Sequence, residues 1–136
     1  MSAEQQRLKE NKENAMRFYQ LLVGDHDYEA AGKLVGDEYI QHNPYILDGY
    51  DALVDAMKTH PLWKDRPKWK INMVYPVAEG DLVYFQVVLP PIREGQRATV
   101  WERFRFNSDG KIVEHWDAFQ TLDMSLSEVV NDAALY

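Results

Sequence analysis

Two carboxylates and a histidine fall on predicted inward faces of the last two strands of the chain. In the last strand His115 and Asp117 share one side and Ile112 lies on the other, outward side. In the strand before it Glu102 shares a side with Phe104. Burying an unpaired carboxylate costs several kcal/mol, so such a group must be paired, neutralised or functional. Because burial also raises the pKa of a carboxyl, it can become a base that works near neutral pH. The pattern therefore predicts general acid/base chemistry.

The same residue types allow other interpretations. Asp117 could accept hydrogen bonds from His115 or from a backbone amide at the rim of a cavity, with no catalytic role. His42, which precedes Asn43-Pro44, could donate to a substrate carbonyl or could pack the loop. His42, His115 and Asp117 could in principle hold a metal ion, but their spacing is not specific and no metal site is predicted.

Composition excludes several classes of protein. The 136 residues contain 15 Lys plus Arg and 22 Asp plus Glu, a net charge of −7, which argues against binding to nucleic acid or anionic membranes. The sequence has no long apolar run, and its polar first residues do not look like a signal peptide, so we expect a cytoplasmic protein. The absence of cysteine excludes disulfides and thiol nucleophiles. Glycine-rich phosphate loops and serine nucleophile elbows are also absent.

The positions of these residues depend on elements that the hydrophobic period predicts. A period near 3.6 predicts helices over about 4–23, 27–35 and 50–60, each followed by glycine or proline. Residues 38–44 precede or include a proline and should be extended, as a short strand or a structured loop.

The second half of the chain changes to a period of two. This predicts four strands joined by turns, and a capping-box pattern at 125–128 predicts a short terminal helix. Helices followed by an antiparallel meander indicate an α+β fold in one domain, residues 1–136, with helices on one face of the sheet. The predicted strands are 69–75, 82–89, 97–106 and 111–120.

Three segments are specific enough to compare with known families. They are Tyr39-Ile40-Gln41-His42-Asn43-Pro44, Asp48-Gly49, and the run from Phe104-Arg105-Phe106 through Asp109-Gly110-Lys111-Ile112-Val113-Glu114-His115-Trp116-Asp117. Together they resemble the SnoaL-like branch of the NTF2-like superfamily, over a core of about residues 10–122. The resemblance implies an NTF2-like cone, in which a curved antiparallel sheet wraps around a pocket covered by N-terminal helices. It also implies a homodimer through the outer sheet face, which would explain why strand 82–89 is apolar on both faces.

Family members include polyketide cyclases that close a ring by aldol condensation with an acidic residue and no cofactor. The resemblance places that acidic residue at Asp117 and the family's histidines at His42 and His115. We expect Asp117 to remove a proton next to the carbonyl of a small apolar compound, in aldol or related isomerase or lyase chemistry, while a histidine polarises the oxygen. No metal or other cofactor is expected. Substrate contacts are expected from Glu102, Gln86, Tyr39, Trp101, Phe104 and Phe119.

Two other functions remain open. The pocket could bind an apolar metabolite without changing it. An epoxide hydrolase with an Asp–Arg–Asp arrangement would need Arg103 or Arg105 in the pocket, but strand alternation places both on the outer face. Tyr39 is interpreted as an aromatic wall of the pocket rather than as a proton donor.

Overall fold

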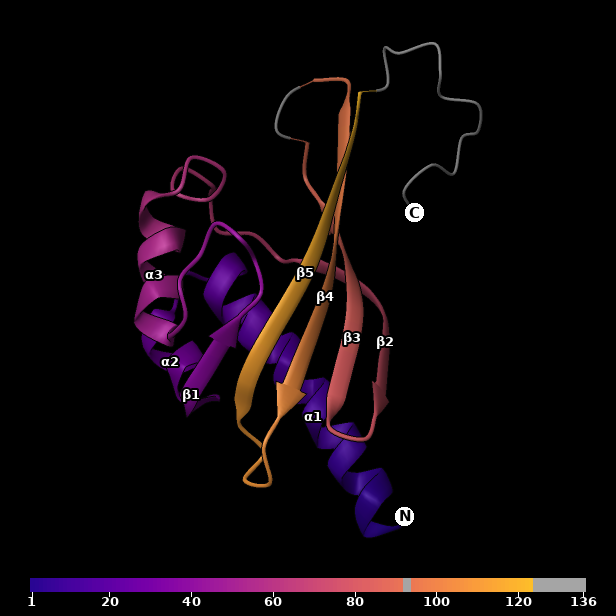
Figure 1. Cartoon of the computed structure of the whole chain (residues 1–136). Helices are drawn as coiled ribbons and strands as arrows, with labels where there is room; N and C mark the ends of the chain where they lie inside the picture. Colours follow the sequence, from indigo (N-terminus) through magenta and orange to yellow (C-terminus); the bar gives the residue numbers. More distant parts are fainter. Residues whose placement is uncertain (92–93, 124–136) are drawn as a thin grey trace.

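Helices on one side of a five-stranded sheet make up the part of the chain that the computed structural model describes, residues 1–91 and 94–123 (Figure 1). The predicted α+β architecture, with helices preceding a meander, is confirmed. No helix in these two ranges is long and apolar enough to cross a membrane. The elements are α1 (Ala3–Tyr19), a π-helical turn (Gln20–Gly24), α2 (Tyr28–Gly32), β1 (Val35–Gln41), α3 (Tyr50–Thr59), β2 (Asn72–Glu79), β3 (Leu82–Leu89), β4 (Gln96–Phe106) and β5 (Ile112–Asp123).

The sheet is curved and unclosed, with the strand order β1-β5-β4-β3-β2 (Figure 1). Strands β2 to β5 form the predicted antiparallel meander, whereas β1 pairs with β5 in parallel. The expectation of a fully antiparallel sheet is therefore wrong at one edge, where β1 runs parallel to β5. A long connection separates β1 from β5, so no local turn fixes their relative direction.

The second predicted helix is shorter than expected. Helix α2 ends at Gly32, and Val35 and Gly36 belong to β1 rather than to the helix and its stop. A Cβ atom on Gly36 would lie 2.9 Å from Cγ1 of Val113, so glycine is needed here for close strand approach rather than for a helix end. The terminal helix predicted from 125–128 lies outside the described residues.

A β-bulge changes the predicted faces at the start of β5. Near the end of β4, Phe106 pairs with Ile112 and Val113 is left out of the regular pairing. An inserted residue shifts the alternation of side chains, so Ile112 is fully buried. The prediction that Ile112 faces outward is therefore wrong, whereas Glu102 and His115 are buried as predicted.

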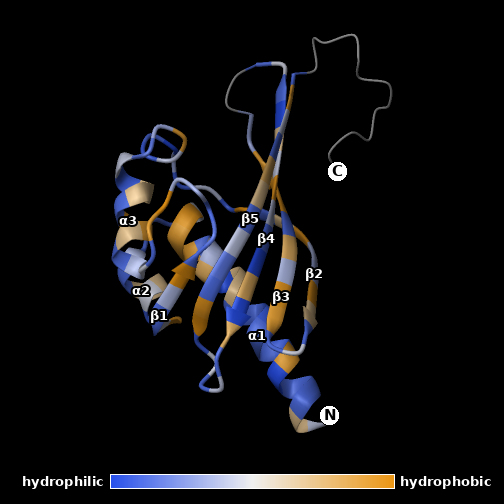
Figure 2. Ribbon diagram, in the orientation of Figure 1, coloured by the Kyte–Doolittle hydropathy of each residue, from blue (hydrophilic) through white to orange (hydrophobic). Residues whose placement is uncertain are grey.

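The core lies between the second half of α1 and the inner sheet face. Phe18 meets Phe104 edge-to-face with ring centroids 5.7 Å apart, and Tyr19 meets Phe85 in the same way at 5.6 Å. Figure 2 shows the matching change along α1, which is hydrophilic near its start and more apolar where it reaches the sheet. These contacts fix one wall of the candidate site.

The side chain of Gln20 joins the end of α1 to the chain that leads into β2. Its Oε1 accepts from the backbone N–H of Ile71 at 2.9 Å, and its Nε2 donates to the carbonyl oxygen of Trp69 at 3.0 Å. The N–H of Trp69 in turn donates to the carbonyl oxygen of Gly24 at 3.1 Å. Residues 69–71 are therefore held by the helix, and β2 begins later than predicted, at Asn72.

We expect Gln20→Ala to lower the free energy of unfolding by about 1–3 kcal/mol, because the N–H of Ile71 and the carbonyl oxygen of Trp69 lose their partner in a partly buried region. Urea denaturation measures this value. Gln6→Ala is the control, since the Gln6 side chain bonds Glu10 on the exposed part of α1. It should change stability by less than about 0.5 kcal/mol. Equal effects of the two substitutions would contradict the role assigned to Gln20.

Candidate functional site

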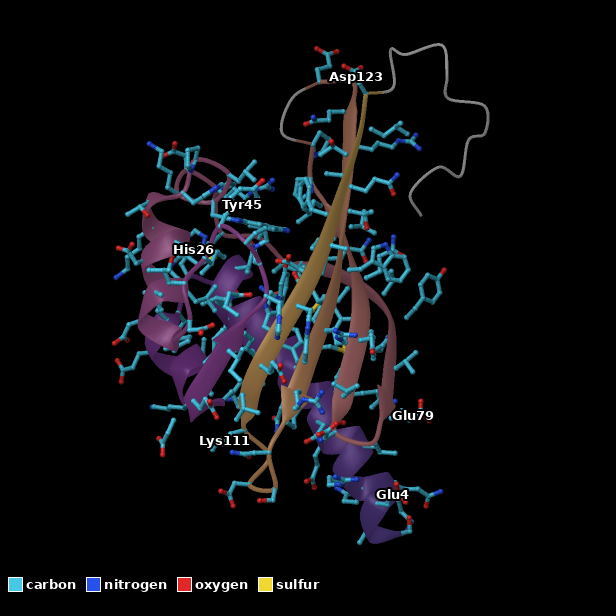
Figure 3. All side chains as sticks on the ribbon, in the orientation of Figure 1. Glu4, His26, Tyr45, Glu79, Lys111 and Asp123 are labelled. Carbon is cyan, nitrogen blue, oxygen red and sulfur yellow. The ribbon has the colours of Figure 1, made fainter. Side chains whose placement is uncertain are left out.

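A cavity of about 300 Å³ lies between the helices and the inner face of the sheet. This volume is near the lower end of the range of about 300–1,000 Å³ for ligand pockets, so the site suits a small molecule. Tyr45, labelled in Figure 3, belongs to the loop between β1 and α3 and contributes to the lining. Most of the wall is apolar, with contributions from Phe18, Leu22, Val23, Leu53, Met57, Trp63, Val100, Phe104 and Phe119.

A cluster of Glu102, His115 and Asp117 lies in this mostly apolar wall. Glu102 on β4 lies directly across from Asp117 on β5, and His115 enters from the neighbouring pair on the same face. Nε2 of His115 is 2.5 Å from Oε2 of Glu102 and 4.0 Å from Oδ2 of Asp117. Strand pairing thus brings together the three residues that alternation predicted to face inward.

The orientation of His115 is set by Gln41 at the end of β1. Oε1 of Gln41 accepts from the backbone N–H of Asn43 at 3.0 Å and lies 2.7 Å from Nδ1 of His115. Because that oxygen can only accept, Nδ1 of His115 carries a hydrogen and donates it. Nε2 is therefore directed at Glu102, and both ring nitrogens are occupied.

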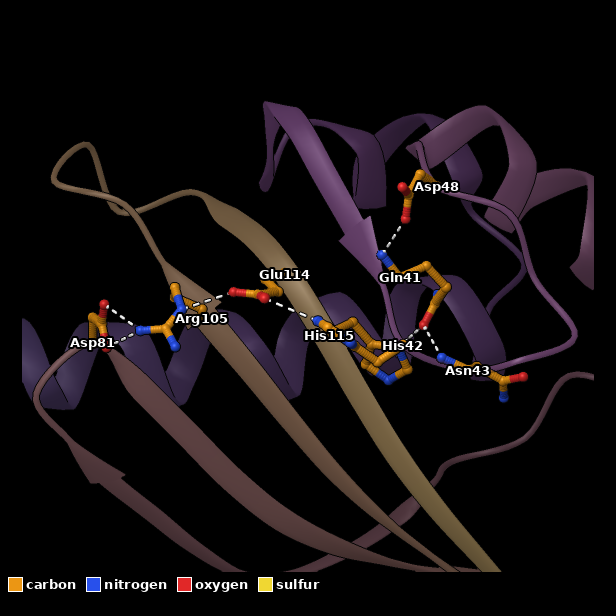
Figure 4. A network of polar contacts seen from close by, with 8 residues as sticks. All are labelled: Gln41, His42, Asn43, Asp48, Asp81, Arg105, Glu114 and His115. Carbon is orange, nitrogen blue, oxygen red and sulfur yellow. Dashed lines mark hydrogen bonds and ion pairs between the residues drawn. The ribbon is translucent and has the colours of Figure 1, made fainter.

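Asn43 holds the carboxylate of Asp117. Its Nδ2 lies 3.1 Å from Oδ1 and 2.9 Å from Oδ2 of Asp117. The loop that carries Asn43 is closed by Asp48, whose Oδ1 accepts from the backbone N–H of Gln41 at 2.7 Å (Figure 4). Asn43 was not predicted as a site residue. The signal available in the sequence was the place of Asn43 beside proline in the Gln41-His42-Asn43-Pro44 segment, in which His42 was the predicted site residue.

Burial and mutual charge shift the pKa values of the buried pair. Burial raises the pKa of the Glu102 carboxyl above its ordinary value, an effect larger than the opposing influence of His115. Burial alone would lower the pKa of His115, but the carboxylate of Glu102 and the hydrogen bond to it outweigh this and raise it. Both shifts favour retention of a proton by the Glu102–His115 pair.

Tyr19 and Tyr39 also belong to the polar part of the lining. Burial and the charges of Glu102 and Asp117 raise the pKa values of both Tyr19 and Tyr39 well above the usual range, so both hydroxyls stay protonated. Hydrogen bonding between Tyr19 and Glu102 also contributes to the raised pKa of Tyr19. Tyr39 stacks against His115, with ring centroids 6.4 Å apart.

His42 lies on the other side of the sheet from the cavity. Its Nε2 is 2.9 Å from Oε1 of Glu114, and its ring stacks on Trp116 with centroids 4.5 Å apart. Arg105 bonds Oε2 of Glu114 and continues this outer network to Asp81 (Figure 4). Since Gln41 points to His115, the next residue along the extended chain points away from the cavity. The structure therefore does not bring His42 together with Asp117 and His115.

The six expected substrate contacts divide into two groups. Tyr39, Glu102, Phe104 and Phe119 are among the described residues that line the cavity. Gln86 and Trp101 form a cross-strand pair on the opposite face, where Trp101 is 52% exposed and Gln86 donates to Oγ1 of Thr99 at 2.9 Å. The pairing register excludes both from the cavity lining, because residues next to inward-facing Phe85 and Glu102 must point outward.

Glu102, His115 and Asp117 are also the described residues best placed to hold a metal ion. Each offers one ligand atom, and these atoms lie within 4.8 Å of one another. A histidine with two carboxylates is a donor set compatible with several divalent metals. The sequence suggested His42, His115 and Asp117 as possible metal ligands. In the structure Glu102 stands in place of His42, which bonds Glu114 on the outer face.

The sequence of this chain matches a known protein family. A family model for the SnoaL-like domain matches residues 15–115. The chain belongs to the SnoaL-like domain family. Membership in the NTF2-like superfamily, expected from the sequence, is thereby confirmed. No curated protein sequence gives a match to this SnoaL-like chain.

Solved structures show the same fold at low sequence identity. An NTF-2 like protein of unknown function from Burkholderia xenovorans is 20% identical, with a TM-score of 0.66 over 83% of this chain and 84% of that one. A proposed ketosteroid isomerase from Kribbella flavida is 15% identical, with a TM-score of 0.65 over 83% and 79%. A SnoaL-like protein of unknown function from Burkholderia thailandensis is 17% identical, with a TM-score of 0.57 over 81% and 94%. At these identities the likeness establishes the fold alone.

We expect Glu102→Gln to reverse the direction of the His115 pKa shift. In the wild type the pKa should lie above 6.5, because the Glu102 carboxylate favours the imidazolium. Without that carboxylate, burial outweighs the smaller effect of Asp117 and the pKa should fall below 6.5. Titration of the His115 ring by NMR measures the change.

Glu114→Gln is the matched control for this titration, because Glu114 bonds His42 and Arg105 on the outer face. It should leave the His115 pKa unchanged. A His115 pKa that stays raised in Glu102→Gln would show that Glu102 is not the charge that stabilises the imidazolium.

Proposed function

We propose that this SnoaL-like protein is a cofactor-independent acid/base enzyme that acts on a small apolar carbonyl compound. One observation carries the proposal: Asp117 lines a mostly apolar cavity next to the buried, hydrogen-bonded Glu102–His115 pair. A carboxylate held in place in a mostly apolar cavity is an arrangement suited to removing a proton next to a carbonyl group.

Asp117 is the better base of the two carboxylates. The Glu102 side chain is 4% exposed and is hydrogen-bonded to His115, whereas the Asp117 side chain is 18% exposed. The amide of Asn43 contacts both carboxylate oxygens and so limits rotation of the group. A restrained base loses less entropy when the substrate is bound in a reactive geometry.

The proposed reaction begins with proton transfer to Asp117. The bond between the α-carbon and its hydrogen breaks, the proton moves to a carboxylate oxygen of Asp117, and the electron pair forms an enolate. In an isomerisation the same proton returns to another carbon. In an aldol closure the enolate carbon attacks a second carbonyl of the substrate, and the resulting alkoxide takes the proton from Asp117. The Glu102–His115 pair stays next to Asp117 throughout the reaction. Its His115 ring, with Nε2 4.0 Å from Oδ2 of Asp117, interacts electrostatically with that carboxylate.

An alternative proposal is that the cavity binds an apolar molecule without changing it. The predominance of aliphatic and aromatic lining residues supports this alternative. It predicts ligand-induced stabilisation that depends little on Asp117. An epoxide hydrolase is less well supported, since Arg105 bonds Asp81 and Glu114 outside the cavity and Arg103 lies over Trp116.

We expect Asp117→Asn to abolish deuterium uptake from heavy water into ketones and polyketide-like diketones. The asparagine side chain has nearly the same shape but cannot accept the α-proton, so exchange should fall by about 100-fold or more. Mass spectrometry of the recovered compounds measures uptake.

Glu114→Gln serves as the control, because it removes a carboxylate from the same strand on the opposite face. It should exchange at the wild-type rate. Full exchange by Asp117→Asn would refute the assigned base. Ligand binding without exchange in any of the proteins would favour the non-catalytic alternative.

We also propose that the chain forms a homodimer through the outer face of the sheet. Val77 pairs with Tyr84 across β2 and β3, and Trp101 lies in the adjacent row on β4. These apolar side chains are 58%, 40% and 52% exposed, respectively. Apolar side chains gathered on one face of a sheet are typical of protein–protein contacts.

Trp101→Glu is expected to shift the dimer toward monomer in sedimentation velocity, because it would bury charge at the interface. Leu47→Glu is a matched control, since Leu47 is 81% exposed but lies in the loop between β1 and α3. A wild-type protein that sediments as a monomer at all concentrations would rule out the proposed dimer.

A further inference from the structure

His60 brings a hydrogen-bond donor to the cavity wall from the end of a helix. The residue follows α3 directly and is among the described residues that line the cavity. The backbone N–H of Leu62 donates to Nδ1 of His60 at 3.2 Å, so the neutral ring carries its hydrogen on Nε2. The Nε2–H group has no hydrogen-bond partner among the described residues. It is therefore a donor still able to bind an acceptor.

The donor atom of His60 is accessible. The side chain is half-buried, and Nε2 is not among the fully buried nitrogen and oxygen atoms that lack a partner. An atom that is neither hydrogen-bonded nor fully buried is open to water or to a bound molecule. A ligand that fills the cavity can therefore replace water at this nitrogen.

The turn after α3 holds the ring of His60 in place. Pro61 disfavours the helical conformation for His60, whose ψ of 132° ends the helix. The carbonyl oxygen of His60 accepts from the backbone N–H of Trp63 at 2.9 Å. Nε of Arg66 donates to the carbonyl oxygen of Leu62 at 2.9 Å, and its guanidinium lies 5.1 Å from the ring centroid of Trp63. A donor that is already oriented binds an acceptor at a smaller entropy cost.

His60 and Asp117 belong to different layers around the same cavity. His60 comes from the end of α3, whereas Asp117 and Glu102 come from the sheet strands β5 and β4. Much of the remaining lining is apolar, including Leu53, Met57 and others already named. The cavity thus offers a hydrogen-bond donor from the helix layer and carboxylates from the sheet.

We propose that His60 is a substrate-binding residue whose Nε2–H donates to a second oxygen of the ligand, separate from the carbonyl group next to Asp117. The described lining carries Glu102 and Asp117 but no lysine or arginine, so the two carboxylates disfavour an anionic ligand. The acceptor is therefore a neutral oxygen. The matching ligand is a mostly apolar compound with two carbonyl groups.

The binding role of His60 is independent of the proposed function, whereas its consequence for the reaction rests on it. Isomerisation requires one carbonyl group. Aldol closure requires a second carbonyl group, which the enolate carbon attacks. A cavity that binds two carbonyl oxygens therefore favours aldol closure over isomerisation, and His60 selects substrates that carry both groups.

A matched pair of ligands tests this assignment without any need for turnover. The diketone is 1,4-diacetylbenzene, and its partner is 4-isopropylacetophenone, in which an isopropyl group of similar shape replaces one acetyl group and removes its oxygen. The 1,3-isomers of both compounds repeat the test with the two groups closer together. We expect His60→Leu to lower the affinity for the diketone, relative to its partner, by about tenfold in at least one pair. Calorimetry and the quenching of tryptophan fluorescence by ligands beside Trp63 measure the affinities.

Two further variants control for loss of the ring and loss of a histidine. His60→Gln keeps an N–H donor near the position of Nε2, so the ratio of the two affinities should stay within about threefold of the wild-type ratio. His26 is not among the described lining residues, and asparagine tolerates its φ of 56°. His26→Asn should therefore bind both compounds like wild type.

An affinity ratio that His60→Leu leaves unchanged in both pairs would overturn the assignment. An equal loss of affinity for diketone and partner would also overturn it, because it would show that His60 only holds the turn. Deuterium exchange separates this inference from the proposed function. If the ratio falls in His60→Leu but no protein exchanges deuterium, the proposed function fails and the His60 binding site stands. If exchange depends on Asp117 and the ratio does not change, only this inference fails.

Discussion

The loss of water around Glu102 and His115 is the physical constraint on which the site depends. A carboxylate and an imidazole that are almost fully buried must satisfy each other, and the 2.5 Å contact between them does so. This contact is possible because β4 and β5 pair antiparallel, with Glu102 two residues before Phe104, the partner of His115. Gln41 then occupies the other ring nitrogen from the parallel strand β1. Three strands therefore cooperate to make burial of these groups tolerable.

The carboxylate of Asp117 has a different environment, because it lies beside the loop after β1 that carries Asn43. Asp117 is held by Asn43 rather than by a buried cation, and its side chain keeps some exposure to the cavity. Two carboxylates directly across a strand pair thus differ in burial and in partners. Such a difference is how one site can hold a proton on one group while another stays free to accept one.

The two faces of the sheet carry two separate sets of polar residues. The inner face carries the Glu102–His115 pair and Asp117, while the outer face carries a network that runs from His42 through Glu114 to Arg105. Trp116 is covered by the ring of His42 from this network and by Arg103, whose guanidinium lies 4.0 Å from the Trp116 ring centroid. Family membership and the low-identity structural neighbours agree with this fold, and the chemistry must be argued from the site itself.

Local sequence determined which strands exist and which of their residues face inward. A period of two is a property of the extended backbone, so Glu102, His115 and Asp117 could be placed on the inner faces without knowing the partners of each strand. The same reasoning failed for Ile112, because a bulge depends on how two strands fit together. It also could not place His42, since the direction and end of β1 are set by its parallel pairing with β5. The bond from Asn43 to Asp117, the occupied nitrogens of His115 and the meeting of His60 and Asp117 in one cavity were decided only by the tertiary structure, because each joins groups that lie far apart in the chain.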